Sequence, residues 1–199
     1  MDLWRLMQQG HRCITPSRFV NILYNTLKLD RNQQQDAHEL LVMMLDAMNY
    51  SSRGTHTTII EQNGQESRTD TTFLTLEIPI TSSTLDECMT HYCAPETVEW
   101  NGGQAIKRTE IQMPPLLFIT LKRFTSKNKK NTDMVKIPLM YKDYELKAVC
   151  NHSGTTNGGH YTATVLLDKW YEFNDESVSV VDSPSTPRAY CLMFRKKAM

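Results

Sequence analysis

The sequence predicts an α+β protein in which helices come first and antiparallel strands follow. Apolar residues recur at helical spacing over residues 1–50. From residue 104 onward, short apolar stretches are separated by turn signals such as Gly158-Gly159 and Ser183-Pro184. A length of 199 residues suits a single domain, or one compact domain with a protruding subdomain.

Three helices are predicted in the first fifty residues. Residues 3–7 carry apolar side chains on one helical face, and Thr15-Pro16 is typical of an N-cap followed by proline at the first helical position. The third and clearest helix follows Asn32, a candidate cap. Its apolar positions recur at a spacing of 3.6 residues. They are Ala37, Leu40, Leu41, Met44, Leu45 and Met48.

Beyond Tyr50 the pattern favours strands, with one short helix over 84–92. Residues 55–61 are rich in Thr and Ile, Asn63-Gly64 predicts a hairpin turn, and 74–80 alternate with a period of two. Further strands are expected at 104–112, 116–124, 134–138, 144–150, 160–167, 169–173, 177–181 and 189–195. The cations Lys122 and Arg123 are expected at the solvated end of their strand.

The composition excludes several classes of function. Lys plus Arg and Asp plus Glu number 22 each, so no net charge draws the chain to nucleic acid or to an anionic membrane. No apolar run approaches the ~20 residues that span a bilayer, and the N-terminus lacks a signal pattern. The five scattered cysteines form no disulfide framework. We therefore expect a soluble protein of the cytosol or nucleus with reduced thiols.

Two carboxylates stand at the start of the third helix. Asp36 and Glu39 are three residues apart and therefore share one helical face. Acids at this position are favoured by capping and by the helix dipole, which is the structural interpretation. The functional interpretation is a rigid pair of carboxylates that binds a basic or amide-bearing ligand.

A histidine and an amide are expected to meet in the second half of the chain. His160 follows Gly158-Gly159 at a strand start, and Asn174 and Asp175 lie at the end of the next strand. A hairpin would place either residue beside the imidazole, where an amide or acid fixes the ring tautomer, as in a Cys/His/Asp triad. The structural alternative is an Asn-Asp turn.

Five motifs in this order resemble the ubiquitin-specific proteases. They are Gln-Gln-Asp-Ala-His-Glu at 34–39, Leu-Lys-Arg-Phe at 121–124, Gly-Gly-His-Tyr at 158–161, Trp-Tyr-Glu-Phe-Asn-Asp at 170–175, and a closing strand at 189–194. The resemblance implies a papain-like thiol hydrolase shaped as a right hand. A thumb would cover 1–50, fingers 51–110 and a palm 111–199.

The resemblance also implies roles for single residues. His160 matches the general base, and Asn174 matches the third triad position, with Asp175 a possible substitute. Asp36 and Glu39 match acids that bind the arginines of the ubiquitin tail, a pairing that suits carboxylate and guanidinium. Gly159 and Tyr161 match the walls of the narrow channel for that tail. No cofactor is implied, and the expected partner is ubiquitin or a ubiquitin-like protein.

The sequence departs from the family pattern at the nucleophile. The family's Asn-x-Cys-Tyr box is absent: Cys13 lacks its neighbours, and Cys150, ten residues before His160, is expected to be a core residue. The chain is therefore expected to be inactive alone, as a pseudoenzyme or a truncated product of an active enzyme. Apolar surface on the thumb would then be left open, and we expect a partner to cover it.

A zinc site is not expected in the fingers. Many family members carry two Cys-x-x-Cys knuckles there, but the corresponding positions of this chain hold no cysteine. Cys88, His91 and Cys93, with His56 as a fourth candidate, have the wrong spacing for a zinc ribbon.

Overall fold

The computed structural model describes residues 14–124 and 129–198, and the chain forms two compact units, 1–50 and 51–199. The boundary coincides with the change in sequence pattern after Tyr50. The helix expected at 3–7 and Cys13 lie outside the described residues. None of the helices within the described ranges is long and apolar enough to cross a membrane.

The first unit contains helices α2 (Ser17–Leu27) and α3 (Ala37–Ala47). Both predicted caps were wrong. Pro16 occupies the N-cap position of α2 and makes no side-chain cap hydrogen bond, while α3 is capped by Asp36 rather than Asn32. Asp36 Oδ1 accepts from the backbone N–H groups of His38 at 2.8 Å and Glu39 at 3.2 Å. Only the residue directly before a helix brings its side-chain oxygen within reach of these orphan donors.

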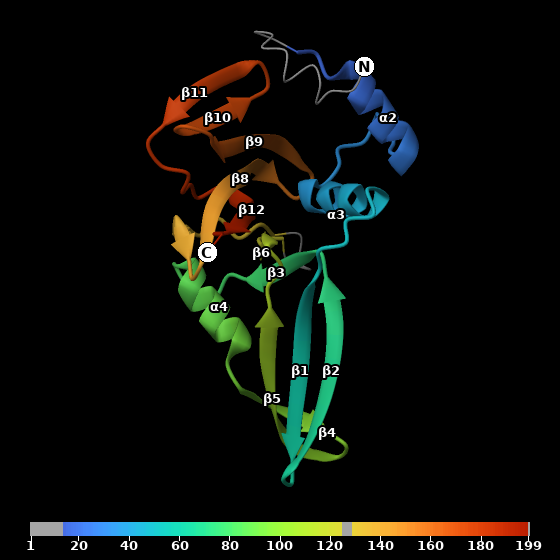
Figure 1. Cartoon of the computed structure of the whole chain (residues 1–199), viewed down its shortest axis with the longest axis vertical. Coiled ribbons are helices and arrows are strands. Elements are labelled where there is room, and N and C mark those ends of the chain that lie inside the picture. The colour runs from blue at the N-terminus through green and yellow to red at the C-terminus, as the bar shows by residue number, and fades with distance from the viewer. Residues whose placement is uncertain (1–13, 125–128, 199) are drawn as a thin grey trace. The chain divides into compact units, whose positions relative to one another are not determined.

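The second unit is built on two sheets (Figure 1). The four-stranded sheet is antiparallel, with the order β2-β1-β5-β4. Its strands are β1 (Gly54–Gln62), β2 (Gln65–Phe73), β4 (Glu96–Trp100) and β5 (Gly103–Gln112). The β1–β2 turn is the predicted one: Asn63 and Gly64 take positive φ angles of 53° and 78°, as a tight hairpin turn requires.

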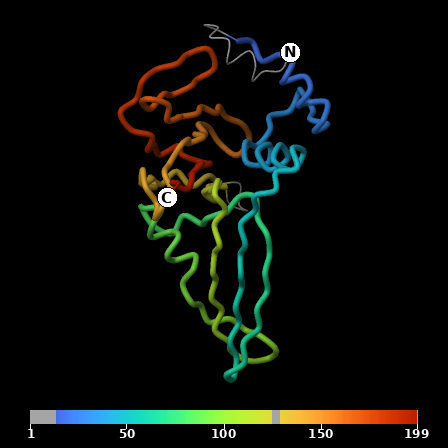
Figure 2. Tube along the Cα trace, in the orientation of Figure 1, coloured from blue at the N-terminus to red at the C-terminus, as the bar shows by residue number. Residues whose placement is uncertain are grey.

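The eight-stranded sheet has the order β11-β10-β9-β8-β12-β6-β3, with β7 paired to β8. All pairs are antiparallel except β3 with β6. Figure 2 lets the reader follow the chain back and forth through these strands. They are β3 (Thr75–Pro79), β6 (Leu116–Lys122), β7 (Met140–Tyr141), β8 (Tyr144–Thr155), β9 (Gly158–Leu166), β10 (Trp170–Asn174), β11 (Ser177–Val181) and β12 (Ala189–Lys196).

The hydrophobic core lies between this sheet and α4 (Leu85–Cys93). Thr84 caps the helix by accepting from the N–H of Glu87 at 3.2 Å, so the predicted helix is confirmed within one residue at each end. The core side chains come from the middle of the sheet and the inner face of the helix. They include Leu76, Ile78, Leu85, Met89, Leu117, Ile119, Leu121, Leu146, Val149, Leu192 and Phe194.

The structure differs from the sequence-based expectation at two places. Residues 134–138 do not form a strand, because Val135 and Ile137 are buried as anchors of a loop that makes one isolated bridge, between Lys136 and Thr84. Arg123 is not solvated: its side chain is 0% exposed. Its Nε and Nη1 donate to three carbonyl groups, those of Ala189, Asn131 and Asp133, and sequence pattern alone does not reveal such partners.

Candidate active site

The site is built on the hairpin of β8 and β9, which turns at Thr156-Asn157 rather than at the expected Gly158-Gly159. Gly154 has a φ of 125°, and a Cβ there would lie 2.5 Å from Gly158 O, so glycine is required on steric and conformational grounds. The strand register places Ser153 directly opposite His160.

His160 Nε2 lies 2.7 Å from Asn174 Oδ1. β10 carries Asn174 to this position because it pairs with β9 along its length, Phe173 lying opposite Ala163. A carboxamide oxygen only accepts, so this contact holds the proton on Nε2 and leaves the lone pair of the neutral ring on Nδ1. The expected contact between imidazole and amide is therefore present, and the ring has the tautomer that a general base needs.

Asp175 is the more distant of the two candidate orienting residues. Its Oδ2 lies 3.8 Å from His160 Nε2, and its side chain is 78% exposed. It occupies the turn after β10 with a φ of 51°, which directs the chain away from the strand. An ion pair this exposed contributes little, so the geometry favours Asn174 as the residue that orients the ring.

A polar row lies beside this pair on the same face of the sheet. Thr162 donates to Glu172 Oε1 at 3.3 Å, and Arg188 Nη2 lies 3.6 Å from the same oxygen. Arg188 Nη1 also donates to Ser153 Oγ at 3.3 Å, which links the row to the residue opposite His160. These contacts tie β8, β9 and β10 together around the imidazole. Sequence patterns did not predict this row, because its members come from separate segments of the chain.

Side chains alternate between the faces of a strand, so neighbours of His160 point the other way. Tyr161 packs with His152 on the opposite face, their ring centroids 4.7 Å apart. A Cβ on Gly159 would overlap Ser153 O and the His152 ring. The packing of the hairpin alone therefore requires glycine at position 159. The proposed roles of Gly159 and Tyr161 as walls of a channel for the ubiquitin tail stay predictions.

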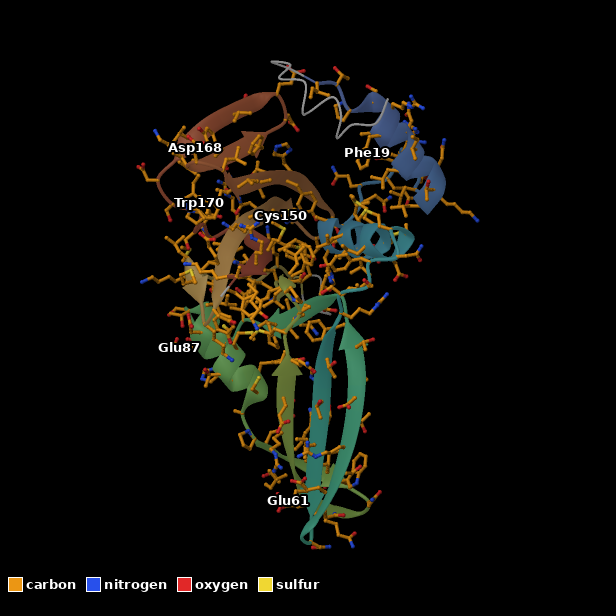
Figure 3. The ribbon with its side chains drawn as sticks, viewed as in Figure 1. Phe19, Glu61, Glu87, Cys150, Asp168 and Trp170 are labelled. Carbon is orange, nitrogen blue, oxygen red and sulfur yellow. The ribbon has the colours of Figure 1, made fainter. Side chains whose placement is uncertain are left out.

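Cys150 is also on the face away from His160. It pairs with Ala163 on β9 and with Cys191 on β12, whereas His160 pairs with Ser153. An odd separation between residues 150 and 153 in a regular strand pair sends the two side chains to opposite faces. Figure 3 labels Cys150 on β8 of the eight-stranded sheet. The alternative in which this thiol approaches the imidazole is therefore wrong.

The predicted tail-binding acids lie in the first unit. Asp36 is the N-cap of α3, and Glu39 is exposed in the first turn of that helix. Asp36 caps the helix through Oδ1, as the structural interpretation expects. Both acids lie at the N-terminal end of the helix, which is also compatible with binding a basic ligand. The structural interpretation holds for Asp36, and the binding role stays a prediction.

Two of the residues considered for zinc make other hydrogen bonds. Cys88 donates to Ser82 O at 3.4 Å, and His91 Nδ1 lies 3.0 Å from Thr81 Oγ1. With His56 they line a cavity of about 340 Å³ beside α4. Within the described residues, no group of three or more His, Cys, Asp or Glu side chains is arranged to hold a metal ion.

The described fold is α+β, and its mostly antiparallel sheet places an imidazole in hydrogen-bond contact with a carboxamide. The chain belongs to the ubiquitin carboxyl-terminal hydrolase family, whose model matches residues 1–194. This finding confirms the resemblance and the predicted fold class.

Proteins of several organisms are similar to this chain in sequence. Ubiquitin carboxyl-terminal hydrolase 2 of Bos taurus is 33% identical over 159 residues, which cover 61% of this chain and 26% of that protein. Ubiquitin carboxyl-terminal hydrolase 10 of Arabidopsis thaliana is 38% identical over 117 residues, 47% of this chain and 13% of that protein. The chain therefore spans a small part of the length of the curated relatives it matches.

The fold also matches solved structures. The SAGA DUB module of Ubp8, Sgf11, Sus1 and Sgf73 bound to monoubiquitin contains a chain that superposes with a TM-score of 0.80. The sequence identity is 25%, and the match covers 92% of this chain and 54% of that one.

Proposed function

We propose that this chain binds the C-terminal tail of ubiquitin or of a ubiquitin-like protein, and that alone it does not hydrolyse the bond after the terminal glycine. The observation that carries the proposal is the 2.7 Å contact between His160 Nε2 and Asn174 Oδ1 in a domain of this family. A similar structure, which contains Ubp8, is bound to monoubiquitin, and this supports ubiquitin as the partner.

The geometry supports the basic half of thiol hydrolysis. With Nε2–H held by Asn174, His160 Nδ1 is free of the amide and would accept a thiol proton, and later return it to the leaving amine. The side chain of His160 is 48% exposed, which leaves the ring open to a substrate or to a thiol. His160 is thus the residue that would perform general acid–base chemistry.

Within the described residues, no cysteine lies where it could act as the nucleophile of thiol hydrolysis. Cys88 and Cys93 belong to α4, and Cys150 and Cys191 pair on the sheet face opposite His160. Acyl transfer needs a thiolate within about 3 Å of the imidazole, and losing one triad member lowers the rate by several powers of ten. This supports the part of the proposal in which the chain alone does not hydrolyse the bond.

Two measurements test the proposal. Titration calorimetry of the chain with intact ubiquitin is expected to give saturable heat, and ubiquitin lacking its C-terminal Gly-Gly is the matched control. An absence of heat with both proteins would overturn the binding proposal. A ubiquitin probe with a C-terminal electrophile is expected to leave every cysteine unlabelled; a covalent adduct would instead establish an active thiol hydrolase.

The tail-binding role of Asp36 needs variants that separate it from capping. Asp36→Ser keeps an N-cap oxygen but removes the carboxylate, whereas Asp36→Ala removes both. If the carboxylate binds tail arginines, both variants weaken ubiquitin binding about tenfold or more, as loss of a charge-assisted hydrogen bond does. Lys129→Ala, the control, is expected to have little effect. Full affinity in Asp36→Ser would assign Asp36 to capping alone.

A further inference from the structure

The outer edge of β8 changes partner next to the candidate site. β12 pairs with β8 from Lys196, opposite Tyr144, to Ala189, opposite Asn151. The next contact on this side is the N–H of His152 with Arg188 O at 2.8 Å. In the described part of the chain, no strand pairs with residues 152–154 along this edge. Their outward carbonyl groups therefore need donors from elsewhere.

Lys130 supplies these donors. Its Nζ donates to His152 O at 2.7 Å and to Gly154 O at 3.3 Å. The same ammonium lies 6.0 Å from the ring centroid of Phe124, a residue that forms an isolated bridge with Lys130. Partial burial, with Arg123 nearby, lowers the pKa of Lys130. One side chain thus substitutes for the strand that is missing at this edge.

A buried arginine fixes the segment that carries Lys130. Arg123 donates from Nε to Ala189 O at 2.6 Å and from Nη1 to Asn131 O and Asp133 O at 3.1 and 3.0 Å. The N–H of Asn131 donates to Arg123 O at 2.6 Å. The backbone on the C-terminal side of Lys130 is therefore tied to β6 and β12, and the ammonium is presented from a fixed base.

The two carbonyls that Lys130 binds flank Ser153, the residue opposite His160. His152 pairs with Tyr161, and Gly154 pairs with Gly159, so the bound segment faces the strand start that carries the imidazole. The His152 ring is packed between Phe124, at a centroid distance of 5.4 Å, and Tyr161 at 4.7 Å. Movement of 152–154 would move His160 relative to Asn174 on β10.

We propose that Lys130 is a positioning residue for His160: its ammonium closes the open edge of β8 and so holds the strand pair that aligns the imidazole with Asn174. The catalytic meaning of this alignment rests on the proposed function. The alignment itself is a property of the free chain and is measured without ubiquitin, so failure of ubiquitin binding would leave this inference standing, and the reverse also holds.

The test uses the isotope-labelled full chain and four variants. Lys130→Met removes the ammonium and keeps the stem, Lys130→Gln keeps a neutral donor with shorter reach, and Lys130→Arg conserves the charge. Lys122→Met removes an exposed lysine at the end of β6 and is the matched control. The readouts are the ring ¹⁵N shifts of His160, which report its tautomer, and amide hydrogen exchange of Ser153 and His160.

We expect Lys130→Met and Lys130→Gln to lower the population of the Nε2–H tautomer of His160. Both variants should also raise the hydrogen-exchange rates of the Ser153 and His160 amides about tenfold, as loss of buried hydrogen bonds does. Lys130→Arg is expected to restore both readouts, and Lys122→Met to match the parent chain. Unchanged tautomer and exchange in the Met variant would overturn the inference. Equal changes in Lys122→Met, or loss of the whole fold in both neutral variants, would also overturn it.

Discussion

β8 and β9 leave no room for a side chain at Gly159, so an alanine there should be strongly destabilising. The added Cβ would overlap Ser153 O and the His152 ring, with Cε1 at 3.0 Å. Ser153 O belongs to the backbone of a paired strand. His152 is 3% exposed and packed between aromatic rings, so neither neighbour can move away cheaply. Overpacking of this kind costs about 1–3 kcal/mol, and we expect Gly159→Ala near the upper end.

Urea denaturation of the full chain measures this loss, and Gly103→Ala is the matched control. Gly103 likewise lies near the start of a strand, but a Cβ there would meet only the end of the Gln62 side chain, at 3.0 Å. This amide ends a flexible side chain, and shifting it disturbs only its exposed hydrogen bond to Trp100 O, so the free energy of unfolding should change by about 1 kcal/mol or less. A similarly small loss for Gly159→Ala, or equal losses for both variants, would refute the steric argument.

Two further predictions concern buried polar groups. Arg123→Met leaves three carbonyls without their donor and should lower the free energy of unfolding by about 3–5 kcal/mol in urea titrations; a loss below about 1 kcal/mol contradicts the anchoring role. Burial raises the pKa of Tyr144, whose hydroxyl donates to Met113 O at 3.1 Å. The unfolded chain loses this proton first, so stability should fall as pH rises above about 10. The free energy of unfolding of Tyr144→Phe should fall less steeply between pH 9 and 11 than that of the parent chain. Identical slopes for the two proteins would refute the assignment.

Local sequence patterns predicted much of the fold where local chemistry decides it. The Asn63-Gly64 turn and the helix after Thr84 need only their own residues, and both are present. β2 was not predicted, because Gln65–Phe73 has no apolar alternation and is a strand by virtue of its partner β1. The reverse error at 134–138 has the same origin: alternating burial of Val135 and Ile137 arises in a loop fixed by the core.

In the candidate site too, local spacing was predictive, whereas features that depend on distant parts of the chain were not. A spacing of 14 residues across a hairpin predicted that His160 and Asn174 meet, and they do. The face on which Cys150 lies depends on strand register, which the sequence does not specify to one residue. The contacts of Lys130 were not predicted, because its carbonyl partners come from a strand more than twenty residues away.

The four-stranded sheet has little interior of its own. Beyond Gly54, the described side chains of β1, β2, β4 and β5 include two that are almost fully covered, Ile59 and Ala105, while residues 65–72 of β2 are all exposed. Toward the far end, where Figure 3 labels Glu61, the ladder of backbone hydrogen bonds is supplemented by Arg108, which bridges Glu61 and Glu66. Dissolved salt weakens such pairs. This extension should therefore fray from its tip at high ionic strength while the eight-stranded sheet stays closed, and a ligand that clasps it would stiffen it.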